Sequence, residues 1–134
     1  MAEGFQLEVA TPDRLIVQEQ VSEAQIPARD GYLGVLPGHA PLIAELKTGV
    51  LSYVVAGQTK YLAIHGGFVE VLPDKVRVLA DLAERSDEID ATRAQVALSR
   101  AQKALENSHA DLDPATALED MMRAQARIEA AAKK

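Results

Sequence analysis

Apolar and polar residues alternate with a period of two from the N-terminus to about residue 84. Phe5, Leu7 and Val9 are separated by the polar residues Gln6 and Glu8, as in a strand that buries one face. Further short apolar runs follow, and turn signals divide them at Thr11–Asp13, Gly57–Gln58, Gly66–Gly67 and Pro73–Asp74. Short strands with turns at this spacing predict a β-sandwich or flattened barrel.

The pattern changes after Ala80. Glycine no longer occurs, and alanine, glutamine, arginine and glutamate become the common residues. Ser86 or Asp87 is expected to cap a first helix, because either side chain can accept a hydrogen bond from a free backbone N–H group. The apolar positions of this helix recur at helical spacing: Ala94, Ala97, Leu98, Ala101, Ala104 and Leu105.

A polar break over residues 107–113 precedes a second predicted helix. Asp113 is its expected N-cap and Pro114 its first helical residue. Its apolar stripe is predicted to consist of Leu118, Met121, Met122, Ala124 and Ile128. The break is short, so the two helices should form an antiparallel hairpin. The predicted fold class is therefore α+β in two parts: a β-sandwich domain over residues 1–84 and an α-helical hairpin over residues 85–134.

Alanine dominates the predicted interface between the two helices. Alanine allows close approach but buries little area, and each buried CH2 group is worth only about 0.8 kcal/mol. A hairpin held this weakly should be able to come apart.

The composition excludes several classes of function. The net charge of −6, from 14 basic and 20 acidic residues, argues against nucleic acid as a partner. The absence of cysteine excludes disulfides and thiolate chemistry. No secretory signal is visible, and no apolar run approaches the ~20 residues needed to cross a bilayer. We therefore expect a soluble protein that reaches a membrane only through a partner.

No recognisable catalytic motif is present. Lys47 and Thr48 lack the glycine-rich loop that would cradle a phosphate, and a Gly-x-Ser-x-Gly run is missing. His39, His65 and His109 are isolated, without further ligands at zinc-site spacing. We interpret His39 and His65 as polar residues of turns or strand ends, and assign no role to His109. The sequence predicts no metal site and no catalytic residue.

Three arginines are expected to converge at the open end of the helical hairpin. If the chain reverses near residue 110, Arg93 lies opposite the region of Arg127, while Arg123 and Arg127 share one helix face because they are four residues apart. Their mutual repulsion would be offset by a bound anion, and guanidinium groups match phosphate oxygens well.

The same arginines also permit a plainer interpretation. Glu119 can pair with Arg123, and Asp90 and Glu129 can neutralise the other two arginines. The result would be a solvated, mixed-charge face without a ligand. The residues alone leave both interpretations open.

Residues 30–49 contain four of the eight glycines and two of the six prolines. Asp30 and Gly31 form a typical hairpin dipeptide, so we expect a type I′ turn there. The run Leu36–His39, with proline second and glycine third, predicts a type II turn.

The run GYLGVLPGHAPL over residues 31–42, followed by LKTG over residues 46–49, resembles the signature of the epsilon subunit of the rotary ATP synthase. The resemblance covers essentially the whole chain. It implies a small, non-catalytic subunit in the central stalk of the proton-translocating enzyme, which makes ATP from ADP and phosphate. It also implies a peripheral location at the cytoplasmic face of the bacterial inner membrane.

The resemblance further implies partners. In this family the sandwich docks on the gamma subunit and on the polar loops of the membrane c-ring. The helical pair switches between a folded form and an extended form that reaches the alpha and beta subunits and restrains ATP hydrolysis. The expected contact residues are Asp30, Gly31, Tyr32, Pro37, Gly38, His39 and Pro41.

Some bacterial epsilon subunits bind ATP on the folded hairpin through an Ile/Leu-Asp-x-x-Arg-Ala motif and two later arginines. The residues of this chain that match are Glu84, Ile89, Asp90, Arg93, Ala94, Arg123 and Arg127. The resemblance thus implies ATP as a regulatory ligand and no required cofactor. The arginines would hold the phosphates, Ile89 would pack near the base, and the two carboxylates would orient polar groups.

Two other classes of function are compatible with the residues. A free-standing nucleotide-responsive binding module would have the same fold and the same arginines but no rotary partner. A small β-sandwich hydrolase would need a nucleophile and a base, and the sequence shows no such pair.

Overall fold

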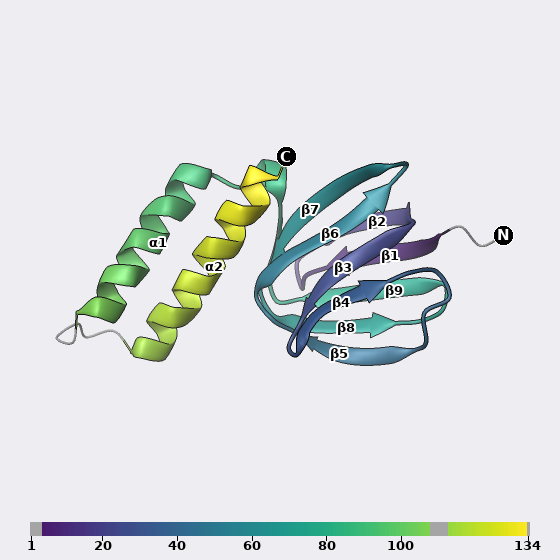
Figure 1. Ribbon diagram of the computed structural model, residues 1–134, viewed down its shortest axis with the longest axis horizontal. Coiled ribbons are helices and arrows are strands. Elements are labelled where there is room, and N and C mark those ends of the chain that lie inside the picture. Colours follow the sequence, from purple (N-terminus) through teal and green to yellow (C-terminus); the bar gives the residue numbers. More distant parts are fainter. Residues whose placement is uncertain (1–3, 108–112, 134) are drawn as a thin grey trace.

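The computed structural model describes residues 4–107 and 113–133. Ten strands form a twisted sheet that folds over itself, and two helices follow (Figure 1). The elements are β1 (Phe5–Ala10), β2 (Leu15–Val21), β3 (Glu23–Ala28), β4 (Gly31–Val35), β5 (Leu42–Leu46), β6 (Gly49–Val55), β7 (Gln58–Ile64), β8 (Gly67–Val71), β9 (Lys75–Ala80), β10 (Ala83–Arg85), the 3-10 turn η1 (Ser86–Glu88), α1 (Ala91–Glu106) and α2 (Pro114–Ala132).

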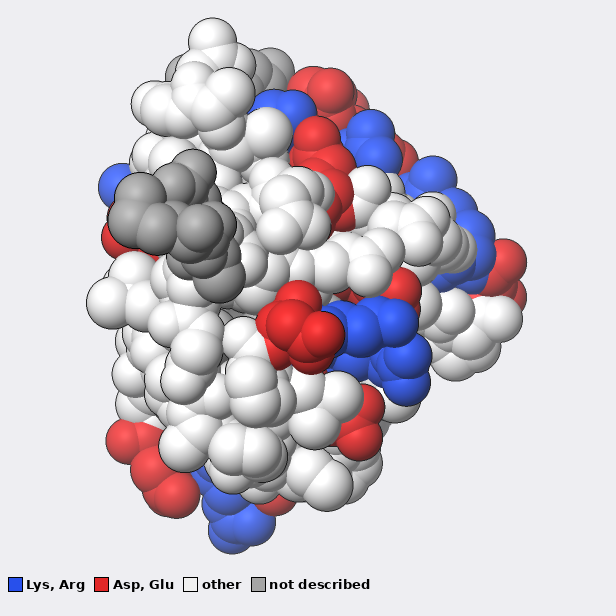
Figure 2. Space-filling model, turned by 90° about the vertical axis from the view of Figure 1, so that its right-hand side faces the viewer, with Lys and Arg blue, Asp and Glu red and all other residues white. Residues whose placement is uncertain are grey.

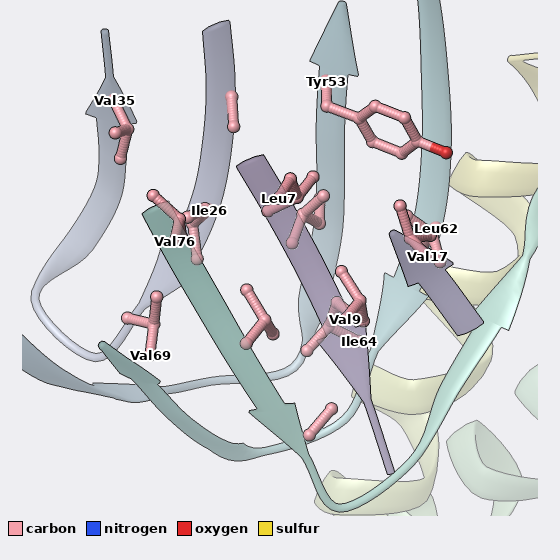
Figure 3. Packing of buried hydrophobic residues seen from close by; sticks show 14 of the residues in the cluster. Leu7, Val9, Val17, Ile26, Val35, Tyr53, Leu62, Ile64, Val69 and Val76 are labelled. Carbon is pink, nitrogen blue, oxygen red and sulfur yellow. The ribbon is translucent and has the colours of Figure 1, made fainter. Parts of the chain in front are cut away.

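The strand order is β10-β7-β6-β3-β5-β8-β9-β1-β2, and β4 pairs with β3 outside this path. Neighbouring strands are antiparallel, except that β1 runs parallel to β9. The inward side chains of the two layers form one apolar core (Figure 3). Phe5, Leu7 and Val9 are buried in it, which confirms the prediction drawn from their period of two. The predicted sandwich, or nearly closed barrel, is therefore confirmed.

Side chains close the seam between the two edge strands, β2 and β10. Arg85 of β10 donates a hydrogen bond to the backbone oxygen of Ile16 in β2, and Arg14 pairs with Glu88 of η1 at 3.0 Å. Edge strands carry unpaired backbone groups, so an arginine that satisfies one of them stabilises the edge. The expected domain boundary at residue 84 falls inside β10, one residue before Arg85.

The predicted type II turn is present after β4. The His39 N–H group donates to the Leu36 oxygen at 3.2 Å, and Gly38 has a φ of 80°. A residue with a side chain would be strained in this conformation, although the space around a Cβ at this position is open.

The predicted type I′ turn at Asp30 and Gly31 is wrong by one position. The register pairs Ala28 with Gly31, so the two-residue loop consists of Arg29 and Asp30. Gly31 is the first residue of β4 and has a φ of 130°. The glycine is needed for this strand-starting conformation and not for the loop itself.

The second helix, α2, lies between α1 and the outer face of the sheet (Figure 1). The buried residues of the described helices are all alanines: Ala94 and Ala101 in α1, and Ala117, Ala124, Ala126, Ala130 and Ala131 in α2. The last three pack with Val50 and Ala63 of the sheet and with Ile89. Close approach on two sides explains this composition, because a larger side chain would separate the layers.

The predicted apolar stripe of the second helix is therefore wrong in part. Leu118 is 47% exposed and Met122 39% exposed, whereas Ala124 is buried as expected. Leu105 in α1 is also exposed. The fully buried positions of α2 are alanines, Leu118 and Met122 lie outside its contact faces, and the predicted stripe residues Met121 and Ile128 are half-buried.

The helix caps agree with the sequence at one end of the hairpin and differ at the other. Asp113 caps α2, with its carboxylate accepting from the Ala115 N–H group at 3.3 Å. The cap of α1 is Asp90, since Ser86 and Asp87 belong to the 3-10 turn. The predicted break lies mostly on residues 108–112, outside the described residues, as does His109.

A chain ending after Glu88 is expected to fold without the helices, because the core and the seam contacts are retained. It should melt cooperatively with the circular dichroism spectrum of a β protein. A matched chain ending after Glu84 loses the Arg85 bond to β2, a charged hydrogen bond worth about 1.5–3 kcal/mol, and should melt several degrees lower. An unfolded 1–88 chain would show that helices and sheet share one cooperative core.

Candidate functional site

A groove with a volume of about 690 Å³ lies at the joint between the sandwich and the helical hairpin. Strand β10, the following linker, α1 and α2 all contribute to its walls. Its size falls in the range of small-molecule sites, roughly 300–1,000 Å³. Six of the seven residues predicted to bind ATP line it: Glu84, Ile89, Asp90, Arg93, Ala94 and Arg127.

The seventh predicted residue, Arg123, lines a neighbouring hollow of about 230 Å³ between the two helices. Arg100 and Arg127 belong to both hollows, so these are adjacent. Arg123 donates from Nη2 to Glu119 at 2.6 Å, while its Nε atom is buried without a partner among the described residues. Arg123 thus lies next to the groove and not in it.

Three residues of the Ile-Asp-x-x-Arg-Ala motif have structural roles that need no ligand. Ile89 is buried against the sheet and α2. Asp90 caps α1 by accepting from the Arg93 N–H group at 3.0 Å. Ala94 is buried at the helix interface. The side chain of Arg93 is the remaining member of the motif that is free to bind a ligand.

Two guanidinium groups in the groove have no acidic partner within the described part of the chain. They belong to Arg93 and Arg100, both of which line its wall. Arg100 was missed in the sequence analysis, although it lies seven residues after Arg93 and so on the same face of α1. Two unpaired cations on one groove wall favour an anionic ligand.

The plainer interpretation, in which all the arginines are neutralised, is only partly correct. Glu119 does pair with Arg123. The Asp90 carboxylate, however, accepts from a backbone N–H group, and Arg127 pairs with Glu84 instead of Glu129. Arg93 is therefore not neutralised in the way that interpretation requires.

Glu84 connects the sandwich to the hairpin. Its Oε1 atom accepts from Nε2 of His65 at 2.9 Å and from Nε of Arg127 at 2.7 Å. The hydrogen bond from His65, together with Arg127, lowers the pKa of the Glu84 carboxyl below its usual value, against the opposing effect of burial. The resulting stabilisation is present above the ordinary carboxyl pKa and is lost as pH falls through the lowered value.

The expected contact residues are divided between the two ends of β4. Asp30, Gly31 and Tyr32 lie where β4 begins, and the Tyr32 hydroxyl accepts from the Val50 N–H group at 3.2 Å. The other four follow the end of β4, in and after the type II turn: Pro37, Gly38, His39 and Pro41. The structure therefore places them in two separate groups.

The end of the sandwich that faces away from the helices is mostly uncharged, with charged side chains in a few clusters (Figure 2). In the described parts of the chain, no helix is both long enough and apolar enough to cross a membrane. Residues 4–107 and 113–133 also contain no group of three side chains arranged to hold a metal ion.

Two family models match this chain, one over the sandwich and one over the helices. Residues 4–86 match the family described as ATP synthase, Delta/Epsilon chain, beta-sandwich domain, and residues 87–132 match its long alpha-helix domain. The ATP synthase epsilon chain of Solibacter usitatus is 55% identical over 134 residues, which cover both chains completely. That of Koribacter versatilis is 56% identical over 81% of this chain and 76% of its own.

Solved structures of ATP synthases contain chains with this fold. One chain in the Euglena gracilis mitochondrial ATP synthase, in a structure with F1 and the c-ring, superposes with a TM-score of 0.84 at 26% identity and covers 97% of this chain and 82% of that one. A chain of the Tetrahymena thermophila central stalk and c-ring gives a TM-score of 0.58 at 14% identity, which shows the fold alone. The chain therefore belongs to the ATP synthase delta/epsilon family, as an epsilon-type, non-catalytic subunit of the central stalk.

Proposed function

We propose that this subunit anchors its sandwich on the gamma subunit and the c-ring and uses its helical hairpin as an ATP-responsive brake on ATP hydrolysis. The observation that carries the regulatory part is the pair of unpaired arginines, Arg93 and Arg100, in a groove formed by both halves of the chain. The subunit would lie at the cytoplasmic face of the bacterial inner membrane, held there by its partners.

The groove links ligand binding to the position of the hairpin. Its walls come from β10 and from both helices, so the complete groove exists only while the hairpin lies on the sandwich. A ligand that binds only this form stabilises it by RT ln(1 + [L]/Kd), about 2.7 kcal/mol at a hundredfold excess over Kd. An interface made of alanines is weak enough for such a contribution to matter.

ATP fits the chemistry of the groove better than a simple anion does. Arg93 and Arg100 offer unpaired donors for phosphate oxygens, and Arg127 keeps further N–H donors beyond the one used for Glu84. Apolar wall residues, among them Leu82 and Val96, offer surface for a base. Bound ATP would hold the hairpin folded, and its loss would release the helices toward the alpha and beta subunits.

The apolar residues left exposed on the hairpin support a second, extended position. Leu118 and Met122 of α2, together with Val96 and Leu105 of α1, are exposed while the hairpin is folded. Leu118 and Met122 are four residues apart and share one face of α2, so together they offer an apolar strip for contact with another protein. In the extended form they would face the alpha and beta subunits.

Docking on the gamma subunit is best supported on the outer face of β1, β2, β8 and β9. Leu15 pairs with Ala10, Ala10 with Leu79, and Leu79 with Phe68, so these side chains form one row across four strands. Leu15, Leu79 and Phe68 are all more than half exposed. The mostly uncharged end of the sandwich that carries the type II turn would meet the polar loops of the c-ring.

Replacing Phe68 with Asp should weaken assembly with the rest of the stalk while leaving the fold intact, because this side chain is 58% exposed. Placing a charge in the centre of an apolar interface typically costs more than 1–2 kcal/mol, or at least about tenfold in affinity. Thr59→Asp, at an exposed position of β7 outside this row, is the control and should assemble normally. Reconstitution at wild-type affinity by Phe68→Asp would remove this face from the docking proposal.

Calorimetric titration of the isolated chain with ATP tests the nucleotide site. Wild-type protein should bind ATP, and Arg93→Ala and Arg100→Ala should each weaken binding about 10- to 100-fold, as expected for a lost charged hydrogen bond. Arg29→Ala is the control, because Arg29 is exposed on the sandwich and pairs with Glu45. If wild-type protein shows no heat of binding at millimolar ATP, the nucleotide site is wrong, and the arginines form a solvated, mixed-charge face without a ligand.

The rival proposal of a free-standing nucleotide-responsive module predicts the same titration but no rotary partner. Purification of the ATP synthase after its extraction from the membrane distinguishes the two proposals. Co-purification of this chain with the gamma subunit and the c-ring supports the stalk assignment, and its absence from the extracted enzyme would favour the free module.

A further inference from the structure

His65 is the one polar or charged side chain among the described residues that is fully buried, with 1% of its surface exposed. It follows directly after β7, and its backbone N–H group donates to the Leu82 oxygen at 2.9 Å. This bond ties it to the segment that leads into β10. The ring is therefore fixed at the junction of the sheet with the hairpin.

The imidazole makes one side-chain hydrogen bond, and that bond goes to Glu84. The acceptor is a carboxylate, so Nε2 must carry the proton that is shared at 2.9 Å. The other nitrogen, Nδ1, is buried with no partner in the described structure. Burying an imidazole that makes only one side-chain hydrogen bond costs free energy that an apolar side chain would not cost. The bond to Glu84 is therefore the feature that accounts for a histidine at this position.

The same carboxylate oxygen receives Arg127 of α2. Oε1 of Glu84 accepts from His65 on the sandwich side and from Arg127 on the hairpin side, at 2.9 and 2.7 Å. Without His65, only the bond to Arg127 would restrain the long Glu84 side chain from rotating toward solvent, since 28% of its surface is exposed. The histidine fixes the rotamer in which the carboxylate faces α2.

We propose that His65 is a positioning residue whose bond to Glu84 holds the carboxylate in place for Arg127 and thereby fastens α2 to the sandwich. The chain His65–Glu84–Arg127 supplies the specific polar contact that the alanine interface lacks. The inference concerns the hairpin alone and is independent of any bound nucleotide, so it holds or fails separately from the ATP site.

Hydrogen exchange of the full-length, nucleotide-free chain, followed by mass spectrometry, tests this proposal. His65→Leu replaces the imidazole with an apolar side chain of moderate size and so removes the donor. Exchange in peptides covering residues 121–133 should become about tenfold faster, which corresponds to the loss of one net hydrogen bond, while β1 and β6 keep their protection. His65→Gln places an amide N–H group near the position of Nε2 and should restore slow exchange.

Two further variants complete the experiment. His39→Leu, a histidine of the type II turn far from the joint, should exchange like the wild type. Glu84→Ala should accelerate the same α2 peptides, and combining it with His65→Leu should add nothing, because both changes break one chain of contacts.

Three results would overturn the proposal. The first is unchanged α2 exchange in His65→Leu. The second is equal acceleration in the sandwich strands, which would make His65 an ordinary core residue. The third is a His65→Gln variant as fast as His65→Leu. If His65→Leu does not fold, Glu84→Ala decides in its place, and unchanged α2 exchange in that variant rejects the proposal.

Discussion

The close approach of α2 to two neighbours is the constraint on which the rest of the structure depends. One helix must pack on α1 and on the sheet at once, and the buried positions of the described helices are therefore alanines. Small side chains bring the backbones together but remove little apolar area from water. The attachment of the hairpin consequently depends on a few larger contacts at the joint, above all Ile89 and the Glu84–Arg127 pair.

Because the apolar contact between the hairpin and the sheet is weak, the charged groups at the joint have a large effect on how strongly the hairpin is attached. Glu84 and Arg127 are both partly shielded from water, with side chains 28% exposed, so their interaction is screened less than that of a surface pair. Arg93 and Arg100 remain unpaired on the same groove. A ligand can shift a conformational equilibrium only through different affinities for the two states, and under the proposed function a groove built from both halves would provide that difference.

The features that depend on local chemistry could be predicted from the sequence, whereas those that depend on which other helix or strand packs against a residue were missed. Pro37 and Gly38 fix their own turn, and Asp113 caps α2 whatever packs nearby. The exposure of Leu118, in contrast, follows from the position of α2 between two layers, which its own periodicity does not contain. His65 does follow directly after β7, as interpreted, but its full burial and its bond to Glu84, 19 residues away, come from packing that the local sequence does not contain.

The two halves of the chain differ in the kind of interaction that stabilises them, and this difference supports the proposed division into an anchor and a moving part. The sandwich has a continuous core of large apolar side chains and a seam closed by Arg85. Its exposed row with Phe68 and Leu79 lies on strands of that rigid core, so a partner docked there would meet a preformed surface. The buried residues of the described helices are alanines, and Leu118 and Met122 are exposed on α2. Under the proposed function, contacts made by the sandwich would be permanent, whereas those made by the helices would compete with the joint at Glu84.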